Sequence, residues 1–114
     1  MDKSIIKIAH DIQSVKIQGA THVALAVAKA LKTFARSDGA MASAEFIRRV
    51  REAGDYLANA RATEPMADNV VEFIIYQLKK NKDASVAELK KTLNEAVDYF
   101  FSLNEKNEQK MIRA

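Results

Sequence analysis

The chain has 114 residues, of which 48 % are hydrophobic and 29 % charged, and its formal net charge is +3. The absence of cysteine excludes disulfides, thiolate metal sites and a thiol nucleophile. No apolar run approaches the ~20 residues of a membrane span, and charges interrupt the N-terminus where a signal peptide has its apolar core, so we expect a cytoplasmic protein without a membrane anchor.

Apolar spacing is helical nearly everywhere, and glycine and proline are scarce, so we expect an all-α fold. The pattern predicts a compact bundle of about five helices. Their expected ranges are 2–14, 20–37, 43–60, 66–80 and 85–110. We expect one domain over residues 1–114, in which 104–114 form a solvated or frayed extension because the apolar pattern stops after Leu103.

The helix at 20–37 is predicted to be the central one. Between Val23 and Ala28 every side is apolar, which indicates a helix buried all round. Ala20, Ala24 and Ala28 form a row of small residues that lets a neighbouring backbone come close. Gly19, directly before this helix, permits a sharp start or a close backbone approach.

The remaining helix starts carry local signals. Asp38-Gly39 predicts a turn, after which Ser43 is the expected N-cap of the third helix. Pro65 suits the first turn of the fourth helix, where its missing N–H costs nothing. Ser85 and Glu88 have the spacing of a capping box at the start of the fifth.

Metal and acid–base chemistry receive little support from the residues. His10 and His22 are too few for a histidine-rich metal site, although His22 could point at a ligand near Gly19. The pairs Glu64/Asp68 and Asp68/Glu72 could hold a divalent ion or share a proton, but carboxylates near a helix start more often complement its dipole. We expect no metal, no cofactor and no catalytic residue within the chain.

Two basic runs, 48–51 and 79–82, could contact phosphates. Neither alternates with aromatic residues, and acids lie close by in the sequence. Solvated helix faces are therefore favoured over a nucleic-acid surface.

The joints KIQGA at 16–20 and ARATEP at 60–65 both precede helices, so both can present backbone N–H groups to an anion. Arg61 adds a guanidinium whose geometry suits phosphate or carboxylate. From the residues alone, an anion site and two ordinary loops remain equally open.

These joints resemble those of the family that unites the α, β and δ subunits of translation initiation factor 2B with ribose-1,5-bisphosphate and methylthioribose-1-phosphate isomerases. That family has an arginine-glycine-alanine turn before an alanine-rich helix, and Gln18-Gly19-Ala20 takes its place here. A threonine-arginine-proline-threonine turn follows in the family, often with an asparagine a few residues on. Ala60-Arg61-Ala62-Thr63 and Asn69 match it in part, and the resemblance spans about residues 5–112.

The resemblance implies that Gln18, Gly19, Ala20, Arg61, Thr63 and Asn69 are candidates for binding a sugar-phosphate or another anion. The family's first arginine is replaced by the neutral Gln18, and its proline by Ala62. The α/β domain that carries the isomerisation chemistry in the family is outside these residues. This leads to the expectation that the chain is not an enzyme.

The leading hypothesis is accordingly a non-catalytic interaction domain, whose expected partner is the α subunit of initiation factor 2 or another family member. The alternative is the substrate-phosphate-binding helical domain of a sugar-phosphate isomerase. Self-association is expected as one way to cover a rim that an α/β domain would otherwise cover, and nucleic acid is not favoured as a partner.

Overall fold

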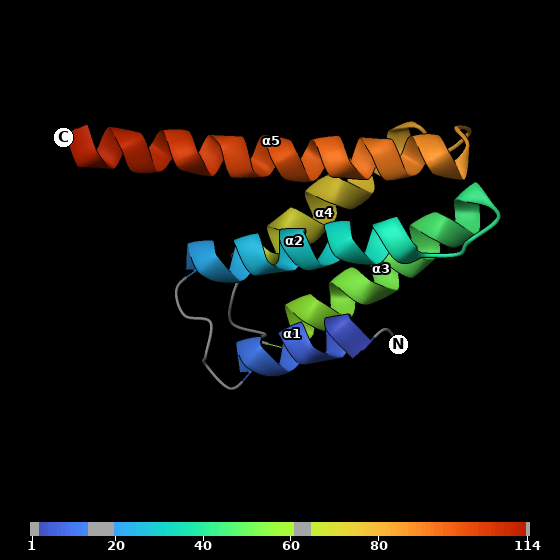
Figure 1. Ribbon diagram of the computed structural model, residues 1–114, viewed down its shortest axis with the longest axis horizontal. Coiled ribbons are helices and arrows are strands. Elements are labelled where there is room, and N and C mark those ends of the chain that lie inside the picture. The colour runs from blue at the N-terminus through green and yellow to red at the C-terminus, as the bar shows by residue number, and fades with distance from the viewer. Residues whose placement is uncertain (1–2, 14–19, 61–64, 114) are drawn as a thin grey trace.

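The computed structural model describes residues 3–13, 20–60 and 65–113, with side chains in these ranges except those of Ser4, 20–21, 65–66 and 104–113. The described chain forms five helices: α1 (Lys3–Gln13), α2 (Ala20–Ser37), α3 (Ser43–Asn59), α4 (Pro65–Lys80) and α5 (Val86–Arg113). Successive helices run in alternating directions, and the C-terminal turns of α5 extend past the rest of the bundle (Figure 1). The predicted all-α bundle is confirmed.

The central position of α2 is confirmed, because it packs against each of the other four helices and its middle turns are fully buried. Val23, Ala24, Val27 and Ala28 are fully buried. The expectation of burial on every side was too strong, since Leu25 is only half-buried. Because Ala24 and Ala28 are fully buried and carry only a methyl group, they allow neighbouring helices to approach α2 closely.

A second close approach joins α3 to α4 at Gly54. A Cβ built on Gly54 would lie 2.7 Å from Cγ1 of Val71. That separation is far below ordinary van der Waals contact, so any side chain at this position would force Val71 or one of the two helices to shift. The sequence pattern did not single out this residue.

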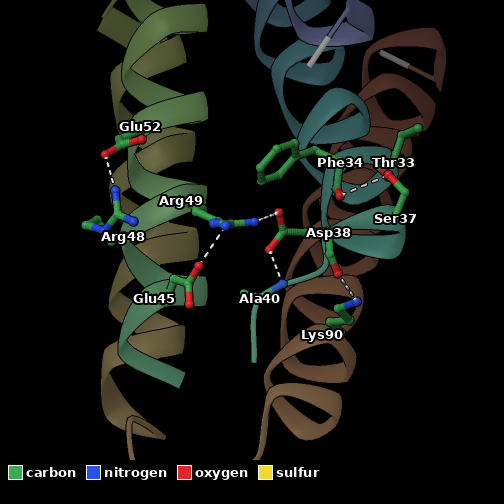
Figure 2. Close-up of polar contacts among 10 residues, drawn as sticks. All are labelled: Thr33, Phe34, Ser37, Asp38, Ala40, Glu45, Arg48, Arg49, Glu52 and Lys90. Carbon is green, nitrogen blue, oxygen red and sulfur yellow. Dashed lines mark hydrogen bonds and ion pairs between the residues drawn. The ribbon is translucent and has the colours of Figure 1, made fainter. Parts of the chain in front are cut away.

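The turn between α2 and α3 is held by Asp38. Its carboxylate accepts hydrogen bonds from the Ala40 N–H at 3.1 Å and from Nη1 of Arg49 at 3.1 Å (Figure 2). The Asp38 carbonyl accepts a third from Nζ of Lys90 on α5 at 2.7 Å. One residue thus connects the end of α2 to α3 and α5.

Of the two expected serine N-caps, the one at α5 is confirmed and the one at α3 is wrong. Ser43 is not the N-cap of α3: Ala42 occupies that position in extended backbone, and the Ser43 hydroxyl instead donates to the Ala84 carbonyl. This acceptor lies 41 positions away in the sequence, so the local pattern around Ser43 could not predict the bond. At α5, the Glu88 N–H donates to the Ser85 hydroxyl at 3.2 Å, as the capping box predicts.

The fifth helix remains helical to Arg113, beyond both the expected end near Lys110 and the point at which the apolar stripe stops. None of the helices in the described ranges is long and apolar enough to cross a membrane.

Candidate functional site

One end of the bundle gathers the four helix ends that flank the two joints. α1 and α3 end there, and α2 and α4 begin there (Figure 1). α2 and α4 also pack against each other. The first four N–H groups of a helix lack intrahelical partners and carry partial positive charge, so this end presents two helix N-termini suited to an anion.

The sequence-predicted site residues are only partly visible in the structure. Gln18, Gly19, Arg61 and Thr63 lie outside the described residues, and Ala20 is described only as the first residue of α2. Asn69 is exposed on α4. The proposed grouping of these residues therefore stays a prediction.

Asn69 belongs to a pocket of about 200 Å³ along the seam between α4 and α5. The pocket is lined by Asn69, Val70, Phe73, Tyr99, Phe100 and Leu103. The rings of Phe73 and Tyr99 stack with centroids 6.1 Å apart and planes inclined by 28°. Tyr99 and Leu103 are 55 % and 43 % exposed, so the seam presents apolar surface to solvent.

A larger groove of about 440 Å³ lies between the last turns of α1 and α3. Its lining residues are Ile6, Ala9, His10, Gln13, Tyr56, Asn59 and Ala60. The groove borders both joints in the sequence, since Gln13 and Ala60 are the last described residues before them.

Sequence reasoning missed this groove. His10 was considered only as a metal ligand, and Gln13, Tyr56 and Asn59 were not considered at all. The available signal was the spacing of three between His10 and Gln13 and between Tyr56 and Asn59, which puts each pair on one helix face. That α1 and α3 lie side by side could not be read from this spacing.

The arginines of the 48–51 run are engaged by carboxylates. Arg48 pairs with Glu52 at 2.7 Å, and Arg49 lies between Asp38 and Glu45, 2.6 Å from the latter (Figure 2). The hydrogen bond to Asp38, with the charge of Glu45, raises the pKa of Arg49. This pairing reduces the positive charge that the run presents to a polyanion.

Arg51 connects α3 to α4 through Glu72, with Nη1 2.5 Å from Oε1 and Nη2 3.3 Å from Oε2. The hydrogen bond to Glu72 raises the pKa of Arg51, and the same bond lowers the pKa of Glu72. Since Glu72 is committed to Arg51, the suggested Asp68/Glu72 pair loses one of its carboxylates. Among the described residues no cluster of His, Asp and Glu could hold a metal ion.

Comparison with known proteins points to one family. The model of the initiation factor 2 subunit family matches residues 16–114. A protein of Pyrococcus furiosus named ribose 1,5-bisphosphate isomerase is 31 % identical over 106 residues, which cover 91 % of this chain and 33 % of that protein. A protein of the same name from Methanocaldococcus jannaschii is 35 % identical over 80 residues, covering 69 % of this chain and 26 % of that protein.

These relatives overturn the expectation that the chain is not an enzyme. Both carry the name of an isomerase, and the chain spans about a third of their length or less. The expectation treated the lack of assignable acid–base groups within 114 residues as a lack of catalysis. In proteins three times as long, such groups can come from elsewhere in the chain.

Proposed function

The chain belongs to the initiation factor 2 subunit family, and on that basis we propose that it is the helical domain of a sugar-phosphate isomerase that acts on ribose 1,5-bisphosphate. The observation that carries the proposal is the similarity to the Pyrococcus isomerase over 91 % of the chain. The role of the domain is to bind a phosphate group of the substrate and to orient the sugar.

The arrangement of the helix ends supports this role. The N-termini of α2 and α4 share one end of the bundle, and both joints enter them. Two sets of backbone N–H groups, aided by the Arg61 guanidinium, suit a phosphate dianion. Gln18 provides no second charge, so we expect Arg61 to supply most of the side-chain attraction.

Ribose 1,5-bisphosphate titrated into the ¹⁵N-labelled chain tests the binding role. We expect amide shifts at residues 17–24 and 60–69, and affinity that falls as salt is raised. Arg61→Gln should weaken binding about tenfold or more, because a charge-assisted hydrogen bond is lost. Arg48→Gln is the matched control, because Arg48 is exposed and paired with Glu52.

Two results would count against the proposal. One is the absence of shifts at either joint with millimolar ligand. The other is equal weakening by Arg61→Gln and Arg48→Gln, which would indicate attraction to net charge without a site.

The isomerase activity has a separate test. These residues have a mass of 12.7 kDa, and the intact mass of the protein from its source cells shows whether the native chain is longer. The activity assay uses that native protein. We expect that native molecule to consume ribose 1,5-bisphosphate and the Arg61→Gln variant to do so with a raised KM. A native molecule that binds the substrate and leaves it unchanged would contradict the enzymatic part of the proposal.

A second candidate function is favoured by the seam between α4 and α5. Tyr99, whose ring stacks on Phe73, and Leu103 are exposed there, and aromatic and apolar side chains of this kind are typical of a protein-contact surface. We propose that in this case the partner is the α subunit of initiation factor 2 or another family member, and that contact takes place in the cytoplasm.

Capture of purified initiation factor 2 by the immobilised chain tests the second candidate. Leu103→Asp should reduce capture at micromolar concentration, whereas Met41→Asp, at a residue 92 % exposed in the turn between α2 and α3, should leave it intact. No capture by the parent chain would rule this partner out.

A further inference from the structure

The groove between α1 and α3 is lined by polar and apolar side chains without a formal charge in the part of the chain that the structure describes, if His10 is counted with the polar ones. Of the described residues that line it, none is an acid, lysine or arginine. Its polar groups are the side chains of His10, Gln13, Tyr56 and Asn59, and its apolar contribution comes from Ile6, Ala9 and Ala60. Its volume of about 440 Å³ falls in the range of small-molecule sites.

The helix ends around the groove also favour an uncharged ligand. α1 ends at Gln13 and α3 at Asn59, and both residues line the groove. The last carbonyls of a helix lack intrahelical donors, and its C-terminus carries partial negative charge. A groove at two such ends disfavours phosphate and favours a molecule that brings hydrogen-bond donors.

We propose that this groove binds the uncharged, hydroxyl-bearing carbon chain of a sugar phosphate. The proposal rests on the proposed function, in which one phosphate group of the substrate binds at the N-termini of α2 and α4. The last turns of α1 and α3 contribute most of the lining of the groove, and these helices end where α2 and α4 begin (Figure 1). The phosphate group then binds at the helix N-termini, which carry partial positive charge, and the hydroxyl groups bind at the helix C-termini, which carry partial negative charge.

The lining side chains have the chemistry that hydroxyl groups require. The amides of Gln13 and Asn59 each supply donors and an acceptor, so they can pair with a hydroxyl in either orientation. The Tyr56 hydroxyl and the His10 ring add further partners. Ile6 is 43 % exposed and offers apolar surface to the C–H face of a sugar.

Three probes separate the parts of the proposal by NMR: D-ribose, ribose 5-phosphate and inorganic phosphate. We expect D-ribose at millimolar concentration to shift the side-chain NH₂ signals of Gln13 and Asn59 and the backbone signals around Tyr56. Inorganic phosphate should leave these signals in place. Ribose 5-phosphate should shift both the groove and the joints.

Variants at exposed positions give a second readout. Gln13→Ala and Asn59→Ala should each weaken the binding of ribose 5-phosphate about three- to tenfold, as expected for the loss of a hydrogen bond. Gln77→Ala is the matched control, because Gln77 is a partly exposed amide on α4 that lines a different pocket. Equal affinity for all four proteins would overturn the groove's role.

The outcomes distinguish this inference from the proposed function. Ribose 5-phosphate shifts at the joints without shifts at the groove would refute the inference and leave the phosphate-binding role standing. Groove shifts with D-ribose but no joint shifts with either phosphate would support the groove as a hydroxyl site and refute the phosphate-binding role. Groove shifts that are larger with inorganic phosphate than with D-ribose would refute the inference.

Discussion

Arg49 of α3 and Asp38, the residue that follows α2, form an ion pair with 3.1 Å between Nη1 and Oδ1. The Asp38 side chain is only 6 % exposed, and its second oxygen accepts the Ala40 N–H. A nearly buried carboxylate that satisfies two donors holds a turn more firmly than an exposed pair does.

Asp38→Ala should therefore lower the free energy of unfolding by about 1–3 kcal/mol, since it leaves the Ala40 N–H and the Arg49 guanidinium without this acceptor. Urea unfolding followed by circular dichroism gives the value. Arg48→Ala is the control: it breaks an exposed i,i+4 pair with Glu52 and should cost less than about 0.5 kcal/mol. Equal costs for the two variants would contradict the anchoring role of Asp38.

Gly54→Ala should destabilise the chain although alanine favours a helix. The added Cβ would lie 2.7 Å from a methyl group of Val71, and forcing α3 from α4 should cost about 1–3 kcal/mol. The double variant Gly54→Ala/Val71→Ala should recover part of that loss relative to Val71→Ala alone. A thermodynamic cycle with no coupling between the two sites would show that they are not in contact.

Ala24→Leu and Ala28→Leu should each cost about 1–3 kcal/mol, because both alanines are fully buried on the central helix and three more carbons would overpack the core there. The comparison variant is Ala44→Leu on the exposed start of α3. Thermal midpoints for the two buried variants that match the parent's would mean that α2 is not packed as described.

The Arg51–Glu72 pair should make stability depend weakly on pH in the acid range. The hydrogen bond from Arg51 holds the folded pKa of Glu72 below its ordinary value of 4.5, so the unfolded chain binds the proton more readily. This contribution is present above pH 4.5 and is lost as the pH falls through the folded pKa. Glu72 is 63 % exposed, so we expect less than about 1 kcal/mol.

Comparing the parent with Glu72→Gln between pH 7 and pH 2.5 measures this effect. The difference in free energy of unfolding should shrink toward the acid end and should be smaller at 1 M salt. A difference that stays constant over the whole pH range would mean that the ion pair contributes nothing and that the substitution acts in another way.

The helix α4 shows what periodicity leaves open. Val70, Ile74 and Leu78 follow one helical stripe and are buried, while Phe73 on the same stripe is only half-buried, and Val71 and Ile75 beside that stripe are buried as well. α4 packs against α2, α3 and α5, so more than one face of it is covered. A single apolar stripe predicts one contact surface, and only the positions of the neighbouring helices show that there are several.

The candidate site also has a part that the sequence could suggest and a part that it could not. The two joints could be proposed from the sequence because glycine, arginine and helix starts are local features of the chain. The groove between α1 and α3 was not, because His10 and Gln13 are separated from Tyr56 and Asn59 by more than forty positions. Nothing in either helix marks the other as its neighbour.

The sequence by itself determined the all-helical class and the central helix, because helical periodicity acts over a few positions, and the turn residues of the two joints carried the family resemblance. Only the tertiary structure decided that α1 and α3 end side by side, that a Cβ on Gly54 would meet Val71, and that Asp38 accepts a hydrogen bond from Arg49. These depend on which surfaces meet when apolar area is buried, and that is a property of the whole chain.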